Sequence, residues 1–60
     1  QLNIGEAINS LEEIEKEIII LRYYQDFRIK DISQVLGIPA STVRYKLKNA
    51  EKSLKRRLEI

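Results

Sequence analysis

Apolar residues recur along the chain at steps of three and four, the spacing of one face of an α-helix. Two capping-box patterns, Asn3 with Glu6 and Ser10 with Glu13, mark two helix starts, because each pairs a side-chain acceptor with a Glu three residues later. The first helix is short, and the second runs from about residue 11 to residue 24. The second is apolar around more than half of its circumference, so we expect most of it to be buried. Its apolar residues, with Phe27 just beyond its end, are Leu11, Ile14, Ile18, Ile20, Leu21 and Tyr24.

Two further helices are predicted in the second half of the chain. The third spans about residues 29–36, and Gly37 ends it because glycine tolerates the left-handed conformation at that position. Pro39 then suits the first residue of a new helix, since its φ is fixed. The inward residues of the third helix are Ile32, Val35 and Leu36. The fourth helix runs from about residue 40 to residue 58, with an apolar stripe of Val43, Leu47, Ala50, Leu54 and Leu58.

The third and fourth helices have the pattern of a helix-turn-helix. A short turn containing Gly37 gives a crossed pair of helices, and Ser33 is small enough to lie at the crossing. The predicted fold class is therefore all-α: a four-helix helix-turn-helix domain, similar to the winged-helix DNA-binding class without the wing, with a long C-terminal recognition helix. Helical hairpins that do not bind DNA share parts of this pattern.

Composition restricts the possible functions. The chain has 60 residues, enough for one small domain over residues 1–60, and because it starts at Gln1 we expect a fragment of a longer protein. The absence of Cys and His excludes disulfides, zinc sites built on those ligands, and Cys or His catalysis. The longest apolar run, residues 18–21, is too short to span a bilayer. We expect no enzyme activity, cofactor, metal ion, membrane contact or small-molecule substrate, and a cytoplasmic location.

Charge is distributed unevenly along the chain. Up to Phe27 there are two basic and six acidic residues, a net charge of −4; from Arg28 onward there are nine basic and three acidic residues, a net charge of +6. A basic half suits a polyanion, and phosphate backbones are the commonest polyanion. The alternative is a solvated surface with uneven charge. The glutamates of the second helix have that simpler interpretation, because no pocket-forming partners accompany them.

The outer face of the fourth helix carries the candidate DNA contacts. Opposite the apolar stripe this face has no acid, and a major groove is wide enough to admit the helix. Arg44 can bind guanine, Asn49 adenine, and Ser41 either kind of base edge. Candidate phosphate contacts lie farther along the helix and at the start of the third helix: Lys46, Lys52, Lys55, Arg28 and Lys30.

Two apolar residues of the second helix lie among charged ones. Ile19 and Tyr23, at positions i and i+4, fall beside Glu12, Glu15 and Lys16. Such a pair indicates a surface for docking a partner protein. The alternative is that another helix of the same chain covers both side chains.

Residues 31–50 resemble the helix-turn-helix of conserved domain 4, or region 4, in bacterial sigma factors, and are most similar to the extracytoplasmic-function type. The most specific part is Leu36-Gly37-Ile38 followed by Thr42-Val43-Arg44. Upstream, residues 18–25 look like the preceding helix of that domain. The resemblance covers nearly the whole chain.

This resemblance implies a domain that binds the promoter −35 element as double-stranded DNA in transcription initiation. It also implies docking on the flap of the RNA polymerase β subunit and possible masking by an anti-sigma factor. Residues matching the base-reading face of the family are Arg44, Tyr45, Lys48 and Asn49, and those matching its backbone contacts are Thr42 and Lys46. Tyr45 and Asn49 depart from the usual residues, so the −35 sequence that is read stays open. The departures Glu12, Arg28, Ser33 and Ser41 are compatible with the fold.

Two other functions remain compatible with the sequence. The helix-turn-helix is also typical of the DNA-binding effector domain of a response-regulator or quorum-type transcription activator, which carries a Thr-Val pair too. A helical protein-interaction module without specific DNA binding is the third possibility, using Ile19, Tyr23 and the tail of the apolar stripe.

Overall fold

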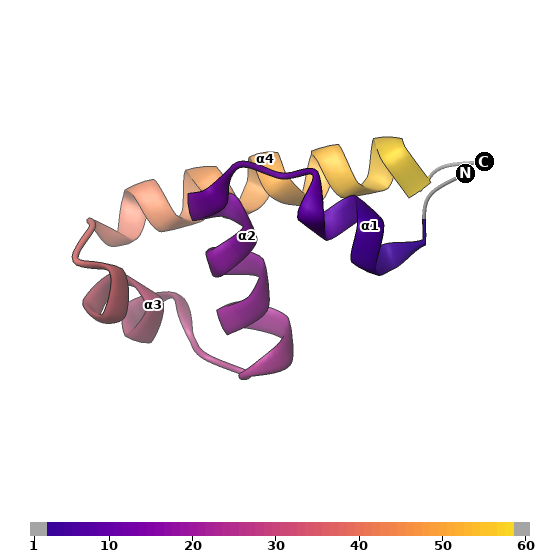
Figure 1. The fold of residues 1–60 in the computed structure, drawn as a ribbon. Helices are drawn as coiled ribbons and strands as arrows, with labels where there is room; N and C mark the ends of the chain where they lie inside the picture. Colours follow the sequence, from indigo (N-terminus) through magenta and orange to yellow (C-terminus); the bar gives the residue numbers. More distant parts are fainter. Residues whose placement is uncertain (1–2, 59–60) are drawn as a thin grey trace.

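The computed structural model describes residues 3–58, and these residues form helices without any strand. The elements in chain order are α1 (Ile4–Asn9), α2 (Glu13–Ile19), the π-helical turn η1 (Ile20–Tyr24), α3 (Ile29–Leu36) and α4 (Ala40–Leu58). α4, with 19 residues, is much the longest of these elements (Figure 1). The prediction of an all-α, four-helix domain with a helix-turn-helix and a long C-terminal helix is confirmed.

α4 is the element against which the rest of the chain packs. It contacts α1, α2 and α3. In Figure 1, α1 lies along the C-terminal part of α4, α2 crosses beside the middle, and α3 lies near the N-terminal part. The described domain is elongated, with extents of 34 × 19 × 16 Å, because a helix of this length is itself roughly 28 Å long.

The core consists of two groups of buried side chains that meet at α4. The first group lies where α1 and α2 face α4, and comprises Ile8, Leu11, Ile19 and Ala50. The second joins α2, α3 and α4, and comprises Ile18, Ile32 and Val43. Leu47 packs against both groups. The apolar stripe predicted for the fourth helix is therefore the surface that holds the other three helices together.

The first helix begins as predicted, but the second does not. The backbone N–H of Glu6 donates to Asn3 Oδ1 at 2.8 Å and the N–H of Asn3 donates to Glu6 Oε1 at 3.2 Å, which confirms this capping box. The prediction of a capping box at Ser10 is wrong, because the Ser10 hydroxyl donates to the carbonyl of Ala7 at 2.6 Å and closes α1 instead. Leu11 is buried in the connection, and α2 begins at Glu13.

The segment between α2 and α3 contains the main irregularities of the backbone. The last turn of the long predicted helix is widened, since the N–H of Gln25 donates to the carbonyl of Ile20 at 3.1 Å, five residues back. Asp26 then takes a left-handed conformation, with φ of 61°, and ends the turn. Beyond it, the carboxylate of Asp31 accepts from the backbone N–H of Arg28 at 3.1 Å and caps α3.

Two apolar residues predicted to face inward are exposed. Val35 is 58% exposed, so its prediction as an inward residue of α3 is wrong: Ile32 and Leu36 supply the packing face of this two-turn helix. Tyr24 is 66% exposed, because the π-helical turn rotates the end of the predicted stripe away from the core.

Candidate nucleic-acid interface

The turn between α3 and α4 fixes the angle at which α4 is presented. Gly37 has a left-handed φ of 68°, and its N–H donates to the carbonyl of Ser33 at 2.9 Å. The same carbonyl accepts from the N–H of Ile38 at 3.2 Å, while the Ser33 hydroxyl donates to the carbonyl of Ile38 at 2.6 Å. Ile38 packs against the second core group. This is the glycine-terminated helix end expected from the sequence. Ser33 joins the end of α3 to the turn through its carbonyl and its hydroxyl.

α4 begins directly after this turn with its apolar and polar faces separated. The N–H of Val43 donates to the carbonyl of Pro39 at 3.0 Å, so Pro39 immediately precedes the helix and Ala40 is its first residue. Val43 and Ala50 are completely buried. Because side chains 3.6 residues apart share a face, burial of this stripe turns the opposite side chains toward solvent.

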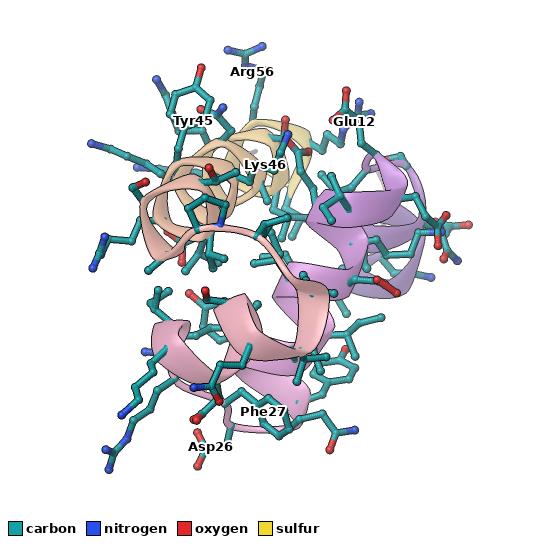
Figure 2. The ribbon with its side chains drawn as sticks, turned by 90° about the vertical axis from the view of Figure 1, so that its left-hand side faces the viewer. Glu12, Asp26, Phe27, Tyr45, Lys46 and Arg56 are labelled. Atoms are coloured by element: carbon teal, nitrogen blue, oxygen red, sulfur yellow. The ribbon has the colours of Figure 1, made fainter. Side chains whose placement is uncertain are left out.

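The residues predicted to read bases lie on that outward side. Ser41, Arg44, Tyr45 and Lys48 are exposed, and Asn49 is half-buried. Tyr45 is 66% exposed and projects away from the rest of the fold in Figure 2. From Ser41 to Asn49 the helix rises roughly 12 Å, comparable with the width of a major groove. The structure thus brings these five residues together on the N-terminal half of α4, four of them exposed.

The predicted backbone contacts fall into three places. Lys52 and Lys55 are exposed farther along α4, whereas Thr42 and Lys46 are half-buried at its side. Arg28 and Lys30 are also exposed, but they lie at the start of α3 rather than on the face of α4. This arrangement matches a helix-turn-helix, in which the first helix crosses the phosphate backbone and the second enters the groove.

Two cationic residues of α4 were missed by the sequence analysis. Arg56 and Arg57 are exposed in its last turn, where positive charge also interacts favourably with the helix dipole. In Figure 2, Arg56 and Tyr45 both point away from the body of the fold. Helical spacing predicts the outward position of Arg56, because Arg56 follows the exposed Lys52 by four residues. The outward face of α4 therefore extends to the end of the described helix.

The two residues predicted to form a docking surface, Ile19 and Tyr23, differ in exposure. Ile19 is only 2% exposed and belongs to the first core group, so the prediction that it lies on the surface is wrong. Its neighbours in the core come from α1 and α4, which cover this side of α2. Tyr23 is 57% exposed, as expected for a surface residue.

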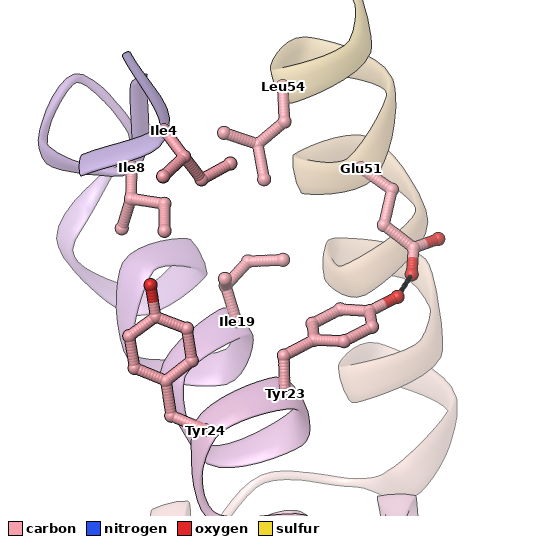
Figure 3. Close-up of a pocket in the computed structure, with 7 residues that line it drawn as sticks. All are labelled: Ile4, Ile8, Ile19, Tyr23, Tyr24, Glu51 and Leu54. Atoms are coloured by element: carbon pink, nitrogen blue, oxygen red, sulfur yellow. Dashed lines mark hydrogen bonds between the residues drawn. The ribbon is translucent and has the colours of Figure 1, made fainter. Parts of the chain in front are cut away.

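Ile19 and Tyr23 nevertheless line one pocket of about 280 Å³ between α1, α2, η1 and α4. Its walls are mostly apolar, as Figure 3 shows, and the lining residues are Ile4, Ile8, Ile19, Tyr23, Tyr24, Glu51 and Leu54. At the edge, the Tyr23 hydroxyl donates a hydrogen bond to the Glu51 carboxylate. This bond, together with partial burial and the nearby negative charge of Glu51, raises the pKa of Tyr23 above its usual value.

Two other kinds of feature, a metal site and a membrane-spanning helix, were looked for among the described residues. Residues 3–58 contain no group of three or more His, Cys, Asp or Glu placed to hold a metal ion. No helix in that same range is long and apolar enough to cross a membrane. The candidate site in this part of the chain is the exposed cationic face of α4.

Comparison with known proteins supplies one match. The family described as "Sigma-70, region 4" matches residues 1–54, which include all of α1, α2, α3 and most of α4. Searches of curated proteins and of solved structures give no match.

Proposed function

Since this chain belongs to the sigma-70 region 4 family, a family of non-enzymatic DNA-binding domains of sigma factors, we propose that it recognises the −35 element of promoters as duplex DNA. The contact is made by α4 lying in the major groove, with α3 across the adjacent phosphate backbone. The activity is that of a transcription initiation factor of the extracytoplasmic-function type. Its place of action is the cytoplasm, where RNA polymerase meets promoter DNA.

The distribution of charge on α4 is the observation that carries this proposal. Between Ala40 and Leu58 there are seven cationic residues and a single acid, Glu51. The core side of the same helix is its apolar stripe, of which Val43 and Ala50 are completely buried, and six of the seven cationic residues are exposed. An exposed, positively charged helix held by a rigid turn fits the shape and the charge of a major groove.

Roles follow from position along α4. Residues near its N-terminus read base edges: Ser41, Arg44, Tyr45, Lys48 and Asn49. Arg44 suits a bidentate contact to guanine and Asn49 to adenine. Contacts to phosphates come from Arg28, Lys30, Thr42, Lys46, Lys52 and Lys55, and from Arg56, which is exposed as Lys52 and Lys55 are.

The second partner of the family is RNA polymerase. We assign the docking of the β-subunit flap to the pocket lined by Ile4, Tyr23 and Leu54, because it is apolar and lies away from the outward face of α4. DNA and polymerase then bind different sides of the domain. An anti-sigma factor that covered the same pocket would compete with polymerase.

Selection from a pool of random duplexes at low salt, followed by sequencing, tests the proposal. Low salt is needed because one small module buries only about 600–1,000 Å² on DNA. We expect enrichment of one short sequence motif. Enrichment of no motif would contradict base reading and favour a protein-interaction module.

Two substitutions on the selected duplex separate the roles of individual side chains. Arg44→Ala is expected to cost about 1–3 kcal/mol of binding and to relax the preference at one base position. Lys52→Ala should weaken binding to every sequence alike and lower the slope of affinity against salt by about one. Lys16→Ala removes the same charge from α2, where Lys16 pairs with Glu13 at 3.7 Å, and serves as the matched control. Equal losses for Arg44→Ala on selected and scrambled duplexes would exclude its base-reading role.

A further inference from the structure

Glu51 is an exception on α4. It is the one acid between Ala40 and Leu58, and it is exposed among cations that face solvent. Lys48 precedes it by three residues and Lys55 follows it by four, so both side chains are its neighbours on the helix surface. A Glu four residues before a Lys is the favoured orientation for a helical ion pair. The sequence of α4 alone therefore favours a pair between Glu51 and Lys55.

The structure shows a different partner for this carboxylate. Glu51 accepts a hydrogen bond from the hydroxyl of Tyr23, which reaches across from η1 (Figure 3). Within residues 3–58, no ion pair of 4.0 Å or less joins Glu51 to Lys48 or Lys55. A carboxylate that accepts a hydrogen bond from a phenolic hydroxyl is held in one direction by this charge-assisted bond. Glu51 consequently points to the pocket side of α4, where Tyr23 lies, and forms no ion pair with either lysine in the described residues.

We propose that Tyr23 is a positioning residue for DNA binding, which keeps the Glu51 carboxylate turned toward η1 and so leaves Lys48 and Lys55 free to contact DNA. This inference rests on the proposed function, because it assigns Tyr23 a part in the DNA contact made by α4. Tyr23 itself touches no DNA. Without the Tyr23 hydroxyl, Glu51 rotates to Lys55, its favoured partner along α4, and neutralises a charge that a phosphate would otherwise pair with.

The size of the effect follows from the loss of one phosphate contact. Each such contact adds about 0.9 to the slope of log affinity against log salt. Losing one contact therefore changes the ratio of the two chains' affinities by up to about 3.5-fold between roughly 50 mM and 200 mM salt. Tyr23→Phe is therefore expected to bind about two- to threefold more weakly at the lower salt concentration, with the difference shrinking at the higher one.

A double-mutant cycle on the 60-residue chain tests the proposal, with a short mixed-sequence duplex as the probe. The variants are Tyr23→Phe, Glu51→Gln and both together, and affinity is measured at the two salt concentrations. Tyr24→Phe is the matched control, because Tyr24 is a neighbouring exposed tyrosine in the same pocket and its hydroxyl makes no hydrogen bond to Glu51. We expect Tyr23→Phe to weaken binding in the unchanged chain and to have no effect in the Glu51→Gln background. Tyr24→Phe should bind as the unchanged chain does.

The outcomes separate this inference from the proposed function. Equal weakening by Tyr23→Phe with and without the Glu51 carboxylate, or no weakening at all, would overturn the positioning role while the duplex is still bound. Failure of the unchanged chain to bind any duplex at low salt would overturn both proposals. An NMR titration of the tyrosine rings without DNA reports on the hydrogen bond itself: the pKa of Tyr23 should fall toward its usual value in Glu51→Gln, and an unchanged pKa would overturn the inference.

Discussion

The turn between α3 and α4 can be tested by adding a single methyl group. Gly37→Ala places a Cβ on a residue whose φ is 68°, a conformation that disfavours every residue with a side chain. Apart from Gly37 itself and its two neighbours in the chain, no atom lies within 4 Å of that Cβ, so the substitution introduces no clash with the rest of the fold. Its effect therefore isolates the cost of the left-handed backbone.

The magnitude follows from this geometry. The left-handed conformation costs an L-residue about 1–2 kcal/mol. A chain of this length is stable by only about 3–9 kcal/mol in total. We therefore expect Gly37→Ala to remove a substantial fraction of the free energy of unfolding and to lower the melting temperature by about 5–15 °C.

Thermal unfolding followed by circular dichroism measures this change, and Gly5 supplies a control of opposite sign. Gly5 lies within α1, its added Cβ meets only Asn3 Oδ1 at 3.5 Å, and its backbone is not left-handed. Gly5→Ala should stabilise the chain by roughly 0.5–1 kcal/mol, because alanine is the better helix former. A Gly37→Ala chain as stable as the unchanged one would refute the left-handed turn and the helix-turn-helix geometry that depends on it.

Two further predictions concern Ile32 in the core and the hydroxyl of Tyr23. Ile32 is completely buried where α2, α3 and α4 meet, so Ile32→Ala should cost about 2–5 kcal/mol in urea unfolding; a cost below about 1 kcal/mol would contradict its place in the core. The pKa of Tyr23 is raised in the folded chain, so its hydrogen bond contributes stability below the unfolded-state value of about 10 and loses it as pH rises through the folded-state pKa. Melting temperature should therefore fall more steeply in alkali for the unchanged chain than for Tyr23→Phe, and parallel curves would contradict the bond.

Elements with strong local signals were predictable from the sequence. The capping box of Asn3 and Glu6, the glycine end of α3 and the span of α4 were all predicted, because each depends on residues close together in the chain. The outward position of Arg44 and Lys48 follows from the same periodicity once the buried stripe of α4 is known. Local pattern thus sufficed for the helix-turn-helix and for the exposed face.

The predictions that proved wrong concern residues whose environment is set by tertiary contacts rather than by local sequence pattern. Ser10 has the spacing of a helix start, yet its hydroxyl closes the preceding helix because Leu11 is drawn into the core. Helical spacing places Ile19 beside charged residues of α2, but α1 packs over it, which the spacing within α2 cannot reveal. The bond between Tyr23 and Glu51 joins residues 28 positions apart, and only the packing of η1 beside α4 brings them together.

Chemical-shift mapping of the ¹⁵N-labelled chain with the selected duplex tests most directly that α4 presents its cationic face to DNA. We predict that the largest shifts fall on Ser41, Arg44, Tyr45 and Lys48, with smaller ones at Arg28 and Lys30 and none around the pocket residues Ile4 and Ile8. Shifts centred on the acidic surface of α2 or on the pocket, with the outward face of α4 unaffected, would contradict DNA binding through this helix.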